Sequence, residues 1–176
     1  MTMPKVAAAP ARKEDLVRQL PAWDAVLREA TTEVFSTMVG TSVAVPPAPQ
    51  SAPDSAPGEG AIVAYVTGMI GIAGAMRAVF SLRCSEHAAT KIASQMLCLS
   101  TEEAADQKSD AIGEVCNIIA GHFKHKIGLG DACTLTVPTV VMGGNYSIHC
   151  LEKGERLEFP VTYEGETVVV KLDIRA

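Results

Sequence analysis

The stretch DAIGEVCNIIAG, residues 110–121, repeats the pattern of EATTEVFSTMVG, residues 29–40, which lies 81 positions earlier. Two acidic residues, a small polar residue and a glycine recur at the same spacing, and mostly apolar residues lie between them. At about 100° per residue on a helix, the offsets of 0, 4, 7 and 11 fall on one side. Each stretch is therefore predicted to form a helix with one buried face and one narrow carboxylate-bearing face directed away from the core.

The two copies differ at one position that matters chemically. Asn117 carries an amide that both donates and accepts hydrogen bonds, whereas the first copy has the shorter Ser36. Asn is also a poor helix former, and Gly121 costs the helix about 0.5–1 kcal/mol relative to alanine. Because both residues weaken the helix, we expect this face to contact a partner; a merely solvated polar face is the alternative. The residues of the face are Asp110, Glu114, Asn117 and Gly121.

The opposite face of the second helix is apolar and is predicted to pack on a sheet. Its residues are Ile112, Val115, Cys116, Ile119, Phe123 and Ile127. In the first copy, Val34, Phe35 and Met38 match Val115, Cys116 and Ile119 in turn. We therefore expect both helices to bury the same face, with Met38 and the other methionines, among them Met142, filling the core.

Length and charge favour one domain that does not bind nucleic acid. The chain of 176 residues has a net charge of −5, and its Lys and Arg residues are scattered. Phosphate backbones require a concentrated basic surface, which this composition does not supply. We expect a flexible leader at 1–20 and a single domain at 21–176, with a proline-rich flexible loop inserted at 46–60.

Cysteine spacing and hydropathy indicate a soluble, cytoplasmic protein. The five cysteines occur singly, without a CxxC pair, and are interpreted as reduced and mostly buried thiols rather than zinc ligands. The N-terminus has no apolar segment of signal-peptide length. The apolar run at 61–76 ends at Arg77, short of the roughly 20 residues that a membrane span needs, so no membrane insertion is expected.

Capping and alternation patterns predict a mostly antiparallel sheet with long helices packed on it, an α+β two-layer fold. Pro21 and Gly40 bound the first helix; Ser85 caps a helix at 86–98; and Ser100 with Glu103 forms a capping box that opens a helix at 101–127. Strands are predicted at 61–68, 70–83, 132–142 (with a bend or edge position at Pro138), 146–151, 157–163 and 167–174, the last two joined by a tight turn at 164–166.

Other candidate sites are weaker. His122 and His125 lie three positions apart and form at most half of a metal site, because no third ligand is evident, so a solvent-facing or partly packed pair is the preferred interpretation. The glycines at positions 68, 71 and 74 are not followed by a helix start or a Lys-Ser/Thr pair, so they are interpreted as strand glycines rather than a phosphate loop. No metal site is predicted.

The motif Asp110-x3-Glu114-x2-Asn117, followed about twenty residues later by Pro138, resembles the signature of the CheC/CheX/FliY phosphatases of bacterial chemotaxis. The string at 110–121 together with PTVVMG at 138–143 is most similar to the CheX branch. The resemblance extends from about residue 22 to the C-terminus and leaves out the leader and the proline-rich loop.

This resemblance implies a CheC-like fold with two halves related by an approximate two-fold, and hydrolysis of the aspartyl phosphate of a CheY-type response regulator. Glu114 and Asn117 would be catalytic, and Asp110 and Gly121 would contribute to docking. CheC-type proteins carry the motif on both long helices, whereas CheX-like proteins carry it on one and usually work as homodimers. Ser36 in the first copy therefore implies one site per chain.

The implied chemistry needs no cofactor or metal of the protein's own, because the receiver domain supplies a metal ion, expected to be Mg²⁺, and a lysine. What hydrolysis still lacks is a water oriented in line with the leaving oxygen. Our hypothesis is that the Asn117 carbonyl accepts a hydrogen bond from this water. Glu114, one turn earlier, would pair with the receiver's lysine.

Two alternatives remain open at this level. The domain could be a non-catalytic receiver-binding or flagellar-switch-like assembly module, although such a surface has no need of an exposed amide at this spacing. It could also be a phosphatase for a receiver of another two-component pathway. The sequence does not distinguish this second alternative from a chemotaxis role.

Overall fold

The computed structural model describes residues 13–45, 64–144, 146, 148 and 154–175. In chain order its elements are α1 (Lys13–Val34), the π-helix η1 (Phe35–Val39), β1 (Ala64–Gly74), β2 (Arg77–Ser85), α2 (Glu86–Leu97), α3 (Thr101–Ala104), α4 (Lys108–Lys126), β3 (Cys133–Leu135), β4 (Thr139–Gly144), β5 (Glu155–Tyr163) and β6 (Glu166–Arg175). The predicted leader falls mainly, and the predicted loop at 46–60 entirely, outside the described residues.

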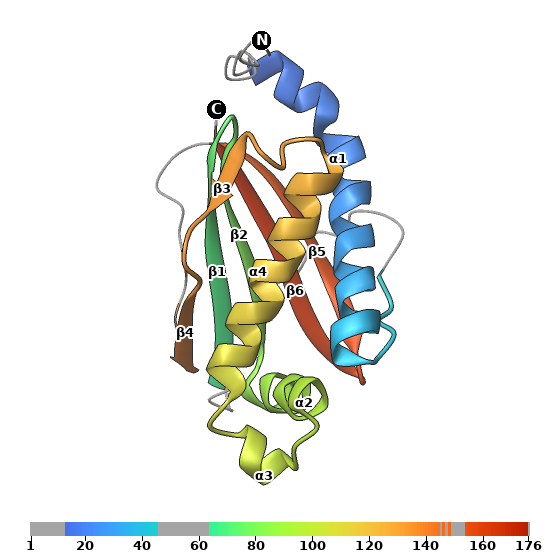
Figure 1. Cartoon of the computed structure of the whole chain (residues 1–176), viewed down its shortest axis with the longest axis vertical. Coiled ribbons are helices and arrows are strands. Elements are labelled where there is room, and N and C mark those ends of the chain that lie inside the picture. The colour runs from blue at the N-terminus through green and yellow to red at the C-terminus, as the bar shows by residue number, and fades with distance from the viewer. Residues whose placement is uncertain (1–12, 46–63, 145, 147, 149–153, 176) are drawn as a thin grey trace, which may run out of the picture.

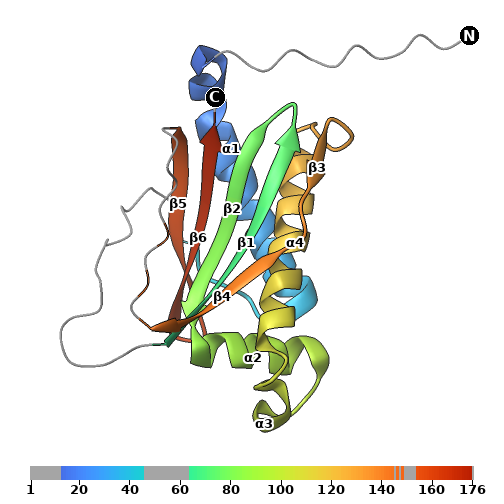
Figure 2. The ribbon, with the colours of Figure 1, turned by 90° about the vertical axis from the view of Figure 1, so that its left-hand side faces the viewer.

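The elements form two layers, as the α+β prediction requires. The strands lie in the order β3-β1-β2-β6-β5, with β4 pairing on β1 beside β3, and every pairing is antiparallel. The long helices α1 and α4 cover one face of this sheet and run side by side in opposite directions, as Figures 1 and 2 show. Within the described part of the chain, no helix is long and apolar enough to cross a membrane.

The strand pairing confirms the expected approximate two-fold. In each half a long helix leads to a strand segment at a sheet edge and then to a hairpin. After α1, Ala44 bridges to Thr162 of β5, and the hairpin β1–β2 follows. After α4, β3 and β4 pair with β1, and the hairpin β5–β6 follows. The edge segment of each half thus pairs with the outer strand of the other half's hairpin, β5 or β1. The inner hairpin strands, β2 and β6, pair with each other at the centre of the sheet.

The core lies between the sheet and the helices. Alternate residues of β2 and β6 point toward the helices and are buried, as the period of two in these strands predicts. On α4, Ile112, Val115, Cys116, Ile119 and Phe123 are buried and Ile127 is half-buried, which confirms the predicted packing face. Apolar burial of this extent is what holds α4, and therefore its outer face, in a fixed position.

The prediction that the first helix begins at Pro21 is wrong, because α1 begins at Lys13 and continues through the proline. Proline in a helix removes one backbone hydrogen bond. Residues 13–20 are rich in good helix formers, and Leu20 packs against the core, so the helix extends upstream of the proline nonetheless.

The end of the first helix is as predicted at Gly40, but its last turn is a π-helix. Gly40 has a φ of +74°, and the Thr41 N–H donates to the Phe35 carbonyl. The wider turn shifts the side chains that follow, so that Val39 is buried and Met38 is 43% exposed. The expectation that Met38 fills the core as Ile119 does is therefore wrong. Met142 on the edge strand β4 is exposed too.

Two further boundaries differ from the predictions. The first hairpin turns at residues 75–76 rather than near 69, because Gly68 and Gly71 lie inside β1. The predicted helix at 101–127 is divided into α3 and α4 by a turn at 105–107, although the capping box of Ser100 and Glu103 is present at its start. The separation lets α3 and α4 follow different directions (Figure 1).

In the second half, Pro138 lies in the gap between β3 and β4, as its predicted bend requires. The helix at 86–98, its Ser85 cap and the last hairpin are confirmed. The strand predicted at 146–151 falls mostly outside the described residues; the two of its residues that are described, Tyr146 and Ile148, are not in a strand.

Candidate functional site on the outer face of α4

Helix α4 lies unusually close to strand β1. A β carbon added at Gly68 of β1 would lie 2.5 Å from the Cys116 Sγ and 2.9 Å from the Ile112 Cγ2. Only glycine permits this approach. The close packing therefore explains why residue 68 is a glycine, one of the three that the sequence analysis interpreted as strand glycines rather than as a phosphate loop. The helix is therefore seated directly on the sheet backbone, and its outer face is rigidly placed.

The four residues predicted for the outer face are distributed over its width. Asp110, in the first turn of α4, and Glu114 are exposed, whereas Asn117 and Gly121 are half-buried. Glu114 and Asn117 are three positions apart and therefore neighbours on the helix surface. The structure thus brings the two predicted catalytic side chains together at the middle of α4.

The Asn117 amide has no hydrogen-bond partner in the part of the chain that the structure describes. Among the described residues, its side chain makes no hydrogen bond, and neither Glu114 nor Asp110 forms an ion pair. A polar helix residue usually satisfies itself through nearby backbone groups or water. Here the amide's donors and acceptor stay available to a molecule that approaches α4 from outside.

The chain between β3 and β4 runs along one side of this face. A β carbon added at Gly113 would lie 3.5 Å from the Pro138 Cβ and 3.6 Å from the Val140 Cγ2, and one added at Gly121 would lie 4.0 Å from the Leu135 Cδ1. Asn117 is midway between these two glycines on the helix. Pro138, the distant part of the sequence motif, is therefore close to the predicted site.

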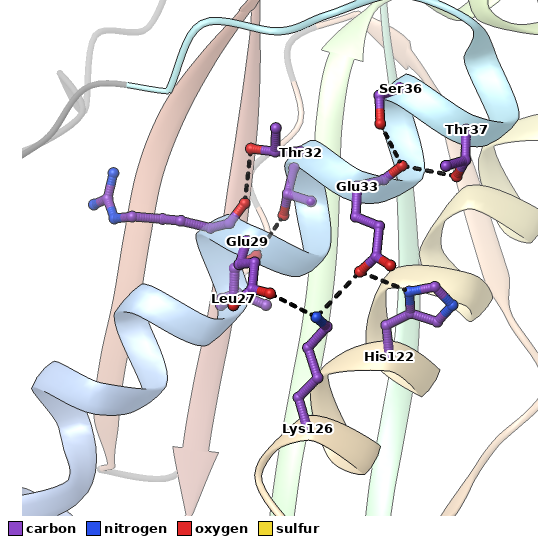
Figure 3. A network of polar contacts seen from close by, with 10 residues as sticks. Leu27, Glu29, Thr32, Glu33, Ser36, Thr37, His122 and Lys126 are labelled. Carbon is purple, nitrogen blue, oxygen red and sulfur yellow. Dashed lines mark hydrogen bonds and ion pairs between the residues drawn. The ribbon is translucent and has the colours of Figure 1, made fainter.

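The equivalent stripe on α1 has a different environment. Glu33 lies 3.2 Å from the Lys126 Nζ and 3.5 Å from the His122 Nδ1, both on α4, and Glu29 accepts a hydrogen bond from the same lysine at 2.7 Å. The Ser36 hydroxyl donates to the Glu33 backbone carbonyl at 2.9 Å. Figure 3 shows this network, in which Glu29 and Glu33 join the two helices and the Ser36 hydroxyl bonds within its own helix.

The internal repeat explains why only the first copy's glutamate is bound by basic residues of the other helix. The repeat offset of 81 residues relates Glu33 to Glu114. The same offset relates His122 to Thr41 and Lys126 to Val45. Neither of these is basic, and both lie beyond the end of η1. Glu114 consequently has no counterpart of the ion pairs that Glu33 makes, and it remains available on the surface.

Charge pairing shifts the protonation of this network. The hydrogen bond and charge of Lys126 hold the pKa of the Glu33 carboxyl below its usual value of 4.5, and His122 acts in the same direction. Glu29 and Glu33 raise the pKa of Lys126 above 10.5. The Glu33 carboxylate and the Lys126 ammonium therefore each favour the charged form of the other.

Sequence reasoning treated His122 and Lys126 without reference to α1. The His122 Nδ1 lies 3.5 Å from the Glu33 carboxylate, and in the described part of the chain no three ligands of the His, Cys, Asp or Glu types converge. The sequence does contain a signal for this network. Glu29 and Glu33 are four positions apart on the first helix, and the two basic residues have the same spacing on the second.

Comparison with known proteins gives one family. The family described as "Chemotaxis phosphatase CheX" matches residues 66–162, which contain α4 and the segment after it. A comparison with curated proteins gives no match.

Several solved structures share the fold. The chemotaxis protein CheX from Vibrio vulnificus superposes with a TM-score of 0.72 at 21% identity, covering 88% of this chain and 99% of that one. A CheX–CheY–BeF₃–Mg²⁺ complex from Borrelia burgdorferi gives 0.66 at 19% identity, with 88% and 98% coverage. Thermotoga maritima FliY gives 0.62 at 14% identity, with 89% and 88% coverage. At these identities the likeness establishes the fold.

Proposed function

The chain belongs to the CheX family of chemotaxis phosphatases, and on this premise we propose that it hydrolyses the aspartyl phosphate of a CheY-type response regulator. The observation that carries the proposal is the Asn117 amide, which has no hydrogen-bond partner among the described residues and lies beside Glu114 on the outer face of α4. The Borrelia burgdorferi relative, whose structure holds CheY with BeF₃ and Mg²⁺, supports a receiver domain as the partner.

Asn117 acts on the attacking water. The amide enters the receiver's active site, and its carbonyl oxygen accepts a hydrogen bond from a water molecule in line with the aspartyl oxygen. The water oxygen bonds to phosphorus as the bond from phosphorus to the aspartyl oxygen breaks, which leaves a carboxylate and inorganic phosphate. The Mg²⁺ ion and the lysine that stabilise the transferred group belong to the receiver. The contribution of Asn117 is orientation.

Glu114 acts on docking. Its carboxylate lies one helical turn before Asn117 and has no basic partner within the described residues, so an approaching lysine of the receiver meets an uncompensated negative charge. Pairing there fixes the register of α4 against the receiver and so the depth to which Asn117 reaches. Asp110, exposed one turn further toward the N-terminus, adds to the same charge.

One site per chain follows from the state of the first copy. Glu33 is held by Lys126 and His122, and the Ser36 hydroxyl is bonded to its own helix. Among the described residues, the stripe that corresponds to the site therefore carries neither an unpaired carboxylate nor an amide: Glu29 and Glu33 are paired, and Ser36 stands where Asn117 stands in the second copy. In this proposal, activity on two receivers at once comes from a cytoplasmic homodimer, as the family resemblance implies, and not from two sites on one chain.

The experiment is phosphate release from a phosphorylated receiver. CheY-type receivers of the same cell are each phosphorylated with acetyl phosphate, and inorganic phosphate is followed with and without the protein. Acceleration for one receiver supports the proposal and names the substrate. Stable binding to a BeF₃-loaded receiver without any acceleration would instead identify an assembly or binding module.

A further inference from the structure

The chain beside α4 leaves the sheet for three residues, Thr136, Val137 and Pro138, between strands β3 and β4. Leu135 contacts α4 at Gly121 and Pro138 contacts it at Gly113. Thr136 and Val137, the two residues between them, therefore lie alongside the helical turn that carries Asn117. The lengths agree, because a helix rises about 6 Å in four residues and an extended chain covers a similar distance in two.

This interruption is fixed to β1 by a pair of hydrogen bonds. The Thr136 N–H donates to the Gly71 carbonyl at 2.9 Å, and the Thr136 hydroxyl oxygen accepts from the Gly71 N–H at 2.9 Å. A β carbon at Gly71 would lie 2.9 Å from the Thr136 Cγ2, so glycine is required for the approach. The threonine hydroxyl thus replaces a backbone carbonyl as acceptor in the hydrogen bonding to β1. The backbone leaves the sheet here but stays hydrogen-bonded to it.

Val137 projects from this fixed backbone into solvent. Its side chain is 85% exposed, the largest value for a large apolar residue in the described part of the chain. Single exposed apolar residues are common on protein surfaces, so exposure by itself decides nothing. The position of Val137 gives the exposure its meaning. The valine lies between Thr136 and Pro138, on the stretch that passes the turn of α4 with Asn117, whose amide makes no hydrogen bond among the described residues.

We propose that Val137 is a docking contact for the phosphorylated receiver domain and that the Thr136–Gly71 pair positions it. The inference rests on the proposed function and extends it. The exposed carboxylates of Asp110 and Glu114 attract the lysine of the receiver's active site, and the valine covers an apolar part of the receiver's surface beside it. In this arrangement the valine supplies an apolar centre and the carboxylates belong to the polar rim, which is the general anatomy of a protein interface.

The experiment measures KM and kcat for the phosphorylated receiver. Val137→Asp is expected to raise KM by roughly tenfold, the effect typical of a lost interface anchor, and to change kcat by less than about twofold. Val137→Ile is expected to keep the KM of the wild type. Thr136→Val, which removes the hydroxyl and keeps the shape, is expected to raise KM in the same way, and Thr136→Ser is expected to restore it.

Leu97→Asp is the matched control, because Leu97 is 47% exposed but ends the helix that Gln95 ties to Tyr163 and Glu164 at the far edge of the sheet. Its KM is expected to equal that of the wild type. An unchanged KM for Val137→Asp, or a changed oligomeric mass of that variant, would overturn the inference while leaving an active wild type, and with it the proposed function, intact. An inactive wild type would overturn the proposed function itself.

Discussion

The Glu33 carboxylate lies 3.2 Å from the Lys126 ammonium, and this pair joins the first copy of the helix motif to the last turn of the second. The equivalent carboxylate, Glu114, has no basic residue at the related position, Val45. The two repeated glutamates therefore differ in their surroundings: Glu33 is bound by basic residues of α4, whereas Glu114 is exposed.

The Glu33 network predicts a stability difference that depends on pH. Because the pKa of Glu33 is lowered in the folded state, mainly by Lys126, its contribution is present above 4.5 and is lost as the pH falls through the folded-state value. Because the pKa of Lys126 is raised, its contribution is present below 10.5 and is lost as the pH rises through its folded-state value. Glu33→Gln is expected to lower the thermal midpoint at neutral pH and to match the wild type in acid.

The control for this prediction is Glu114→Gln, which removes a carboxylate from the same position of the repeat but breaks no ion pair among the described residues. The thermal midpoint of Glu114→Gln should equal that of the wild type between pH 4.5 and pH 10.5. A deficit of Glu33→Gln that stays constant into acid would show that lost packing, and not charge, is responsible. Both variants are measured by circular dichroism at matched ionic strength, since surface charge pairs are screened by salt.

Gly68 provides a prediction about how α4 is seated. Gly68→Ala places a methyl group 2.5 Å from the Cys116 Sγ, so either the helix or the strand must move. Overpacking of this kind costs about 1–3 kcal/mol in the free energy of unfolding. Gly121→Ala, whose nearest neighbour lies at 4.0 Å, should instead stabilise α4 by about 0.5–1 kcal/mol. Urea denaturation compares the two; equal effects would refute the close seating of α4 at Gly68.

The cysteines provide a prediction about reactivity. Cys84, Cys116 and Cys133 are buried and Cys98 is exposed. Burial raises the pKa of the Cys84 thiol to about 12 and raises that of Cys116 as well, so little thiolate is present near neutral pH. Among these four, only Cys98 is expected to react rapidly with iodoacetamide in the native protein, as peptide mass spectrometry can establish. Early labelling of Cys116 would show that α4 separates readily from the sheet.

Glu114 provides a prediction about binding. Glu114→Lys is expected to weaken the affinity for a BeF₃-loaded receiver by about tenfold or more, because it places two like charges at the contact. The same replacement at Glu102, exposed on α3 and outside the predicted site, is the control. Isothermal calorimetry measures both. If the two replacements weaken binding equally, general charge attraction explains the effect and the register role of Glu114 is wrong.

Local patterns in the sequence predicted much of this structure. The apolar period of α4 identified its buried face correctly, and the capping residues Ser85 and Ser100 located two helix starts, because these depend on neighbours within a few positions. The Glu33–Lys126 pair was not predicted, since it joins residues that come together only when α1 and α4 pack in opposite directions.

The same limit applies near Asn117. The run at 132–142 has the composition of one continuous buried strand, and only Pro138 indicated an interruption. That Val137 is exposed depends on the hydrogen bonds of Thr136 with Gly71, a residue 65 positions away. The side-chain amide itself was predicted from its position on the helix. Its half-buried setting against the segment at 135–140 required the tertiary structure.

The central claim is that the Asn117 amide orients the water that cleaves the receiver's acyl phosphate. The most direct measurement is the rate of phosphate release from a phosphorylated receiver under single-turnover conditions, with the wild type and with Asn117→Ala at saturating concentration. Asn117→Ala is expected to bind the receiver and to keep its thermal midpoint, yet to release phosphate no faster than the receiver alone. Acceleration equal to that of the wild type would contradict it.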